Sequence, residues 1–496
     1  MSYSTSSRSR FDAASVIERP GSTTAGRLVF GGGLAFSAIA LFGFLWMNFS
    51  APARVDLAYA VIVLGLLFAA RAIALRSGPL AYERQVGPAI GFARYGPVAI
   101  VLLGVVLRIA FSLRYPAALS SDDATYRQLA EAIIAGRSYN AVEGFAYWPP
   151  GVPFLFAPFS FALGEYAVLG FNLATFVAAE WVAFVLCRRS ASSRAAYTAL
   201  LLIAVWPNFV ASAGLLEKEN LLIVLWPAAA LCFLQVGDRD RPMRLLHATL
   251  AGVLTGIAIL VQPASIFLPL VFAAYAICAY GFRARTIYGI AVLWMCAGAS
   301  ILPWTVRNYV VLHQFVPITT AGGSNFFMVS GPRSDGRWNE SGQKAALVLS
   351  ADEVTRSRLG VQLGLRNIER YPVHYLSAVV RKPLYMYGQN SKNSYWVFAR
   401  GGISGPLAYS ILWPVSNAYY FAILILMAVY FFRYRVTGRG RVEDVLPVAM
   451  LFYPFLSNAM FEASERHRYG VLVFMAIFAA TALSERERPR PRRAGA

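Results

Sequence analysis

The sequence predicts an all-α polytopic membrane protein with about twelve transmembrane helices, and two observations lead to this fold class. Hydrophobic residues make up 57% of the 496 residues and charged residues only 14%, whereas a soluble globular protein carries roughly 25% charged residues. Apolar stretches long enough to cross roughly 30 Å of hydrocarbon as a helix recur along the chain. These features exclude an ordinary soluble enzyme, a disordered chain and a disulfide-stabilised secreted protein.

The chain begins with a Ser-rich polar segment, residues 1–27, which we expect to be a disordered cytoplasmic tail. The apolar stretch after it is too long for the core of a signal peptide and therefore predicts a retained span. Residues 28–95 contain two spans, residues 96–305 a core of seven, and residues 406–483 the last three. The expected spans cover 28–49, 57–75, 96–113, 165–187, 196–213, 220–236, 245–261, 264–281, 286–305, 406–432, 444–461 and 469–483.

Twelve spans place both termini on the same side of the membrane. The segments on that side hold 24 Arg and no Lys, and all of them are short. Short loops rich in Arg and Lys face the cytoplasm, so we expect both termini, including the basic tail 484–496, on the cytoplasmic side of the plasma (inner) membrane. The net charge of +20 is then mainly an orientation signal, and it does not indicate nucleic-acid binding.

The first long outer loop, within residues 114–164, is expected on the periplasmic side with amphipathic surface helices. Ser120 or Ser121 is placed to cap such a helix, and Gly136 is placed to end it. The apolar stretch 149–162 is short and interrupted by prolines, so we expect it to be re-entrant or interfacial. The first helix carries apolar residues at helical spacing on one face: Tyr126, Leu129, Ala130, Ile133 and Ile134.

The second long outer loop, residues 306–405, is large enough for a small periplasmic cap. Ser350 to Glu353 fits the capping-box pattern and predicts a helix that continues to about residue 370. Tyr371 and Pro372 then break this helix, and a second helix is expected to follow. Segment 322–338 is rich in Gly and Ser, which predicts a loop, either beside a ligand or as a plain connector.

Charged residues gather at the outer ends of the expected spans. Asp122 and Asp123 fall in the first turn of the surface helix, where acids stabilise the helix dipole; at the bilayer face, one of them also suits a general base. Fixed Arg donors together with one carboxylate are the mixture that a lipid-linked phosphate needs. The other charged residues on this side are Arg108, Arg114, Glu217, Lys218, Glu219, Arg307, Arg381, Lys382 and residues 465–468.

Common cofactor and nucleophile motifs do not occur in this sequence. There is no HExxH, CxxC, Walker or GxSxG motif, and only four His are present. The sequence therefore indicates no purpose-built metal site and requires no cofactor. Asp122, Asp123 and Glu219 would still share a divalent ion if the fold brought them together.

Five segments between about residues 96 and 483 resemble the bacterial protein O-mannosyltransferase-like and aminoarabinose-transferase-like (ArnT-like) enzymes. These are membrane glycosyltransferases of the GT-C class, which use polyprenyl-phosphate sugars. The order of the segments and the side of the membrane on which they fall both agree with this family. The segments are SSDDATYRQLAEAIIAG, YWPPGVPFLFAPFSFALGE, GLLEKENLLIVLW, PWTVRNYVVLHQFVPITTAGGSNFFM and ERHRYGVLVFMAIFAA.

The resemblance implies roles for individual residues of this sequence. Asp122 matches the family's catalytic Asp, and Asp123 stands beside it, where many relatives have Glu. Two departures are the extra spans within residues 28–95 and Gln262 before Pro263, where relatives often have Arg. The residues expected to bind the donor phosphate or line the site are Arg307, Arg466, Arg468, Lys218, Glu219 and Arg114.

The implied function is inverting transfer of a sugar from a polyprenyl-phosphate donor to a hydroxyl acceptor on the periplasmic face. The acceptor class stays open between a protein, lipid A and a cell-envelope glycan, and a bound divalent metal is compatible with the family. Two alternatives also stay open. One is a ligase or polymerase of lipid-linked glycans such as O-antigen, and the other is a twelve-helix transporter or flippase.

Overall fold

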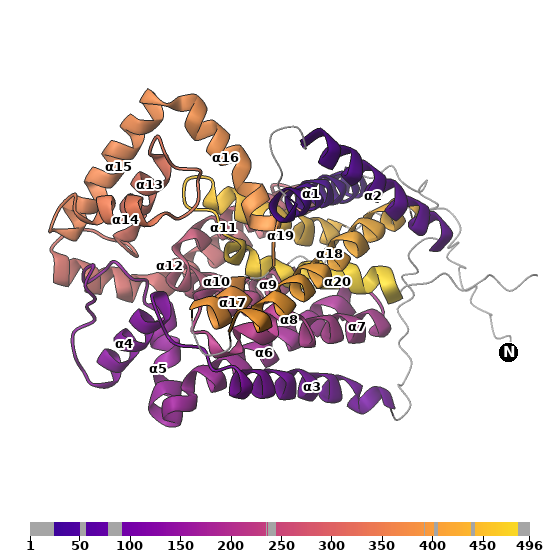
Figure 1. The fold of residues 1–496 in the computed structure, drawn as a ribbon, viewed down its shortest axis with the longest axis horizontal. Coiled ribbons are helices and arrows are strands. Elements are labelled where there is room, and N and C mark those ends of the chain that lie inside the picture. Colours follow the sequence, from indigo (N-terminus) through magenta and orange to yellow (C-terminus); the bar gives the residue numbers. More distant parts are fainter. Residues whose placement is uncertain are drawn as a thin grey trace, which may run out of the picture.

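The computed structural model describes residues 24–49, 56–77, 92–234, 236, 245–390, 392–400, 405–437 and 442–484. Over these ranges the chain is helical, apart from turns and a single isolated bridge between Ala141 and Gly144. The fold is therefore all-α, as predicted (Figure 1). The predicted disordered tails fall largely on residues 1–23 and 485–496, which lie outside the described ranges, and residues 24–27 belong to the first helix.

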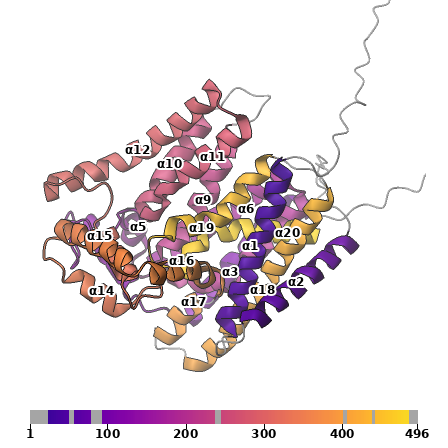
Figure 2. The ribbon, with the colours of Figure 1, turned by 90° about the horizontal axis from the view of Figure 1, so that it is seen from above.

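Each of the twelve predicted apolar ranges contains a helix, and several of these helices run in nearly the same direction (Figure 2). By length and composition, eight helical segments are able to cross a membrane, or nine if one bent pair is a single span. The total of twelve spans stays a prediction. The helices are α1 (Thr24–Asn48), α2 (Asp56–Ser77), α3 (Phe92–Arg114), α6 (Ala167–Ser190), α7 (Ser193–Ala204), α9 (Lys218–Leu234), α10 (Leu245–Val261), α11 (Leu268–Tyr280), α12 (Ala284–Leu312), α18 (Gly405–Thr437), α19 (Val445–Asn458) and α20 (Tyr469–Ser484).

Helix α20 is the centre of the helix bundle. Every residue from 469 to 482 is buried, and the helix packs against α7, α9 and α18. A helix that is apolar on all sides has no face suited to water, so it lies inside the bundle. Gly470 allows this packing, because a Cβ there would overlap the ring of Trp226 on α9. The charged residues that precede α20 are thereby carried into the middle of the protein.

The predicted span 196–213 is broken in the structure. Helix α7 ends at Ala204, and α8 (Pro207–Ala211) continues at an angle of 49° to it. Pro207 lacks the N–H that would extend the helix. The carbonyls freed at the break accept from Arg108 on α3, which reaches the oxygens of Ile203 and Ala204 at 3.3 Å each. Arg108 also pairs with buried Glu180 at 3.3 Å.

The first outer loop contains the predicted surface helix, α4 (Asp122–Ile134). Gly136 follows it with a φ of +63°, which ends the helix as expected. Ser121 precedes α4, but its hydroxyl donates to Asp122 and caps no backbone N–H. Stretch 149–162 forms a helix, α5 (Gly151–Leu163), which continues through one turn into α6. Whether α5 is re-entrant stays a prediction.

The second outer loop forms a helical cap, and its Gly-rich segment corrects one prediction. Residues 321–330 are helical rather than a loop, because this helix packs closely against the helix at 353–370. A Cβ on Gly323 would overlap the carbonyl oxygen of Ser357, so the glycines serve a close helix contact. The cap helices are α13 (Ala321–Ser330), α14 (Glu340–Leu347), α15 (Glu353–Arg370), α16 (Pro372–Tyr387) and α17 (Lys392–Tyr395).

The predicted capping box at residues 350–353 is also wrong. Asp352 caps α15, because its carboxylate accepts from the backbone N–H of Thr355 at 2.7 Å. Glu353 does not turn back to residue 350 but reaches the first outer loop, where it accepts from Phe145 and Ala146. The break before α16, with Pro372 at its first position, is confirmed.

Candidate functional site

Three segments that lie far apart in the sequence meet at Arg466, just before α20. Its guanidinium reaches the carboxylate of Asp122 at 3.2 Å, that of Glu219 at 3.3 Å and that of Glu462 at 3.6 Å. Asp122 begins α4, Glu219 lies in the first turn of α9, and Glu462 follows α19. We call Asp122, Glu219, Glu462 and Arg466 the carboxylate–arginine cluster.

The turn that carries Glu219 is held in place by two buried asparagines. Asn172 on α6 donates to the carbonyls of Ala213 and Leu215 at 2.9 and 2.8 Å. Asn220 donates to the side chain of Asn172 at 3.1 Å and to Leu215 at 3.2 Å. Because buried amides of this kind satisfy the carbonyls of a short turn, the residues between α8 and α9 have one defined conformation.

The segment that carries Glu462 is fixed in a similar way by a buried lysine. Lys382 on α16 donates to the carbonyls of Asn458, Ala459 and Phe461, at 2.6 to 3.3 Å. His467 contacts Glu462 twice, through the backbone oxygen at 3.1 Å and the carboxylate at 3.3 Å. Lys382 therefore joins the cap to the loop that completes the cluster.

The acids of the site differ in their access to water. The side chain of Asp122 is 26% exposed, whereas that of Glu219 is 1% exposed. Burial alone raises the pKa of Asp122, but Arg466 and Lys218 outweigh it and hold that pKa below its usual value. Asp122 is therefore an ionised carboxylate that faces the outside of the cluster.

Two further acids lie behind the cluster and favour the protonated form. Burial, together with the charge of Asp122, raises the pKa of Asp123 to about 7. Burial and the charge of Glu219 raise the pKa of Glu217 to about 8, and one carboxylate oxygen of Glu217 has no hydrogen-bond partner. The site thus holds acids with opposite pKa shifts side by side.

Two lysines complete the charge balance of the site. Lys218 is partly exposed and acts electrostatically on Asp122 and Glu219. Lys392 on α17 donates to Ser464 at 3.0 Å, and burial lowers its pKa. Lys392 and Glu462 were not singled out in the sequence. The spacing of four residues between Glu462 and Arg466 is a signal for Glu462, whereas nothing in the segment around Lys392 distinguishes it.

Three of the predicted phosphate ligands do not contact the cluster. The guanidinium of Arg307 donates to the carbonyls of Phe145 and Tyr139, at 2.7 and 2.8 Å, and so holds the loop after α4. Arg468 is fully buried, donates to two carbonyls near the end of α16 and lies 4.3 Å from the ring of Tyr420. Arg114 is exposed at the end of α3 and lies over Tyr115.

The position of Arg466 bears on the predicted shared divalent ion. Arg466 already lies between Asp122 and Glu219, so an ion at that position has to displace a guanidinium. Within the described ranges, no three His, Cys, Asp or Glu side chains are grouped as metal ligands. A divalent ion shared by Asp122, Asp123 and Glu219 stays a prediction, and we assign no step to one.

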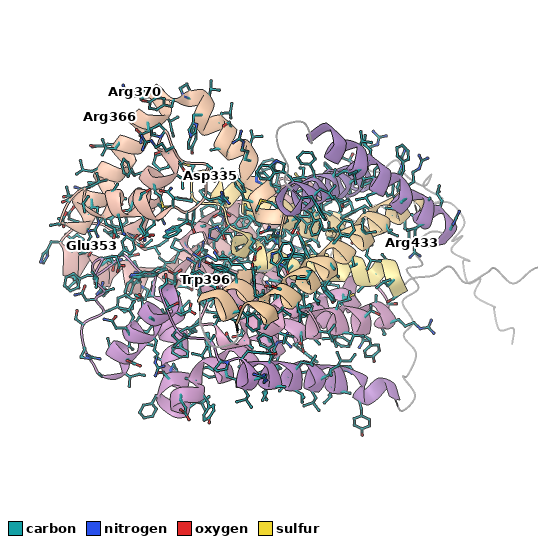
Figure 3. All side chains as sticks on the ribbon, viewed as in Figure 1. Asp335, Glu353, Arg366, Arg370, Trp396 and Arg433 are labelled. Atoms are coloured by element: carbon teal, nitrogen blue, oxygen red, sulfur yellow. The ribbon has the colours of Figure 1, made fainter. Side chains whose placement is uncertain are left out.

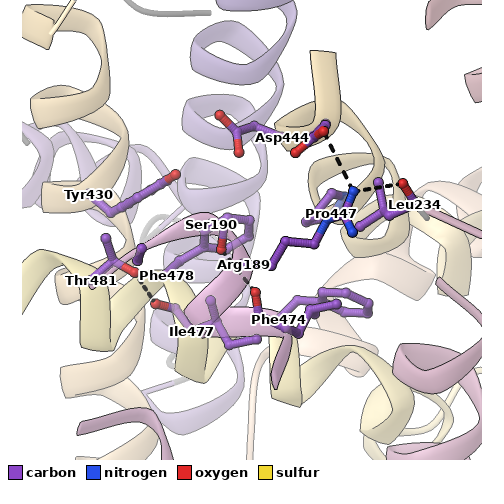
Figure 4. Close-up of a pocket in the computed structure, with 13 residues that line it drawn as sticks. Arg189, Ser190, Leu234, Tyr430, Asp444, Pro447, Phe474, Ile477, Phe478 and Thr481 are labelled. Carbon is purple, nitrogen blue, oxygen red and sulfur yellow. Dashed lines mark hydrogen bonds and ion pairs between the residues drawn. The ribbon is translucent and has the colours of Figure 1, made fainter. Parts of the chain in front are cut away.

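A separate pocket lies at the opposite ends of α9 and α20 (Figure 4). Arg189 at the end of α6 donates to the carbonyl of Leu234 at 2.9 Å and pairs with Glu443 at 3.6 Å. Phe474 and Phe478 form part of its apolar wall. No residue of the carboxylate–arginine cluster lines this pocket.

Residues 148–304 match the protein family described as dolichyl-phosphate-mannose-protein mannosyltransferase. The matched range includes the turn with Glu217 and Glu219, whereas Asp122 and Arg466 lie outside it. The resemblance predicted from the sequence is therefore confirmed. No curated protein matches the chain.

Among solved structures, the chain is similar to the oligosaccharyltransferase of Archaeoglobus fulgidus in the apo form. The identity is 14%, the match covers 79% of this chain and 51% of that chain, and the TM-score is 0.49. It is also similar to ArnT from Cupriavidus metallidurans bound to undecaprenyl phosphate, with 16% identity, coverage of 78% and 77%, and a TM-score of 0.37. The chain thus spans about half the length of the oligosaccharyltransferase.

Proposed function

We propose that this protein is an inverting glycosyltransferase that moves a sugar from a polyprenyl phosphate to a hydroxyl acceptor at the outer face of the plasma membrane. The contact between Asp122 and Arg466, 344 positions apart in the sequence, carries this proposal. It places one partly exposed carboxylate beside a guanidinium, at one end of a bundle of apolar helices. The family match over residues 148–304 supports the same class of reaction.

In the proposed reaction, an acceptor hydroxyl attacks the anomeric carbon of the donor sugar. The bond between that carbon and the phosphate oxygen breaks, and its electron pair leaves with the polyprenyl phosphate. The carboxylate of Asp122 takes the proton of the hydroxyl. Because its pKa is held low, Asp122 is a weak base, which is sufficient when the sugar–phosphate bond is largely broken as the hydroxyl attacks.

The cations of the site have separate roles in this mechanism. Lys218 is partly exposed, and no ion pair of Lys218 is seen within the described ranges, so it is suited to meet the donor phosphate. Arg466 orients Asp122 and contributes positive charge where the leaving phosphate develops negative charge. The buried acid Glu219 and the partly buried acid Glu462 hold Arg466 in that position.

The test is an Asp122→Asn variant of the full chain, expressed in a strain that lacks an active copy. We expect this variant to insert normally into the membrane but to lack one sugar modification of the cell-envelope glycans and lipids. Mass spectrometry of these molecules measures the loss. Glu131→Gln is the matched control, because Glu131 is an exposed acid on the same helix and forms a surface ion pair with Arg127. Near-normal modification by Asp122→Asn would remove Asp122 from the mechanism and with it this proposal.

A further inference from the structure

Helix α16 presents an apolar face outward. Its inner face is buried against segment 334–337, where Arg337 lies 4.8 Å from the ring of Tyr385. The opposite face carries Val373, Leu376 and Val380, which are 80%, 63% and 66% exposed. Their spacing of three and four residues places them on one stripe of the helix. A helix at a water-facing surface normally shows polar residues there.

Helix α15 continues this surface on the other side of the bend at residues 371–372. Its buried face packs through Gly360 and Gly364 against α13. Val361 and Leu365, one turn apart, are 42% and 48% exposed. We call the exposed apolar residues of this region the elbow: Val361, Leu365, Tyr371, Val373, Leu376 and Val380.

Arginines flank the apolar residues of the elbow. Arg358, Arg366 and Arg370 are exposed on α15, and Arg381 is exposed on α16. Figure 3 shows Arg366 and Arg370 near the tip of the projecting pair of helices. Glu369 is the one exposed acid between residues 354 and 387, so the surface is apolar with a strong positive balance.

The place where α16 joins the bundle sets the level of the elbow. Leu384 packs against Gly43 of α1, and the side-chain amide of Asn48 donates to the carbonyl of Gly388 at 2.7 Å. Helix α1 is a candidate span that ends at Asn48. From this end, α15 and α16 project sideways beyond the bundle (Figures 1 and 2). The C-terminal end of α16 therefore lies against the end of α1, and the elbow lies farther along the same projecting helices.

We infer that the elbow rests on the membrane in which the protein is embedded and that it binds anionic phospholipid headgroups of the outer leaflet. The stripe of Val373, Leu376 and Val380 enters the headgroup–acyl boundary, as the apolar face of an interfacial helix does. Arg366 and Arg370 contact lipid phosphates, since guanidinium groups bind phosphate with several donors. This contact would fix the cap relative to the bilayer, and it does not depend on the reaction proposed for the cluster.

The test uses the full chain in two kinds of vesicle, phosphatidylcholine alone and phosphatidylcholine mixed with phosphatidylglycerol. A nitroxide is attached at Leu376→Cys in a Cys278→Ser background, because Cys278 is exposed and would also react. We expect the nitroxide at residue 376 to collide several-fold more often with oxygen, which concentrates in the bilayer, than with a water-soluble nickel complex. Lys344→Cys on α14 is the control, because that position is exposed on another part of the cap and is expected to show the reverse.

The dependence of the probe's accessibility on the charge of the lipid and of the elbow distinguishes a lipid partner from other occupants of this surface. Arg366→Gln combined with Arg370→Gln should abolish the increase in oxygen accessibility at residue 376 that phosphatidylglycerol causes, whereas Arg127→Gln on α4 should not. A water-exposed probe in both vesicles would overturn the inference. Dipolar broadening between probes on two copies would assign the surface to self-association instead. Equal accessibility in both vesicles would overturn the recognition of acidic headgroups.

Discussion

Arg466 is the residue on which the proposed chemistry depends. One guanidinium meets three carboxylates, and only one of these, on Asp122, is open enough to face a substrate. The fork of a guanidinium holds several acceptors in fixed directions, which an ammonium does not. Removal of this cation would also leave buried Glu219 without its ion-pair partner, so orientation and charge balance depend on the same side chain.

We predict that Arg466→Lys lowers transfer about 100-fold, because the positive charge remains while the directed hydrogen bond to Asp122 is lost. The measurement is the rate of sugar transfer in membranes that contain equal amounts of each variant. Arg127→Lys should keep normal activity, since Arg127 makes a similar pair with Glu131 on the exposed surface. Full activity of Arg466→Lys would show that charge alone is sufficient.

The two acids behind the cluster make stability depend on pH. Asp123 and Glu217 have pKa values raised to about 7 and 8 in the folded protein, against roughly 4 when unfolded. Folding favours their protonated forms, so their contribution is present at low pH and is lost as the pH rises through these values. The pKa of Asp122 is lowered in the folded protein, so its contribution to stability has the opposite pH dependence: it is lost as the pH falls, and only at acidic pH.

We therefore expect the melting temperature of the purified protein to fall as the pH rises from roughly 4 towards about 7 and 8, and to level off above these values. Glu217→Gln should flatten this dependence, because the amide has no charge to bury. Asp335→Asn, at a partly exposed acid of the cap, serves as the control and should leave the profile unchanged. An identical pH profile for Glu217→Gln would show that this carboxyl does not titrate in that range.

At the scale of elements, two contacts between helices position the cluster. Arg108 on α3 satisfies the carbonyls at the break after α7, and this break leads the chain to the turn that carries Glu217 and Glu219. In the cap, Glu353 accepts from Phe145 and Ala146, and so fixes the loop that follows α4. Charged side chains thus bind main-chain groups on both sides of the site.

Loss of Arg108 should be strongly destabilising. Arg108→Met leaves Glu180 buried without its partner, and breaking a buried ion pair in this way costs about 3–5 kcal/mol. The double variant Arg108→Met with Glu180→Gln should recover part of this loss, because it buries no unpaired charge. The measurement is thermal unfolding of both variants in the same detergent. Equal losses in the single and double variants would contradict the ion-pair explanation.

The contacts of Arg307 predict a role in holding the loop after α4. Arg307→Gln should increase proteolytic cleavage between residues 139 and 146, since two carbonyls lose their donor. Binding of a polyprenyl phosphate should change little. Arg285→Gln, at the start of the same helix, is the control. A large loss of lipid binding with an intact loop would instead favour the phosphate role that the family resemblance implies.

At the scale of the whole molecule, the site and the pocket of Figure 4 lie at opposite ends of α9 and α20. The arginine count of the short loops predicts that the end with Arg189 faces the cytoplasm. In that predicted orientation the cluster and the cap lie outside. This orientation decides whether a lipid-linked donor meets the site on the outer face.

We expect Asp335→Cys in the cap to react with a membrane-impermeant maleimide in intact cells, because that position is partly exposed and is predicted to be periplasmic. Arg194→Cys, which is exposed in the first turn of α7, should react only after the membrane is opened. Both are compared in the Cys278→Ser background. The opposite pattern would invert the topology and place the carboxylate–arginine cluster in the cytoplasm.

The helical content, the twelve apolar helices and the surface helix at Asp122 follow from local pattern, because hydropathy and helix-ending residues act over a few neighbours. The same patterns failed at residues 321–330, where glycine serves a close helix contact, and at Glu353, which bonds a distant loop. Pairing between residues 122 and 466 depends on how helices pack, which no local pattern contains. The sequence placed charge at the outer ends of the spans. Packing around α20 brought Asp122, Glu219 and Glu462 to Arg466. It also left Arg307 and Arg468 bonded to main-chain carbonyls. The reason is that a charge removed from water must pair with the groups that the fold brings within reach.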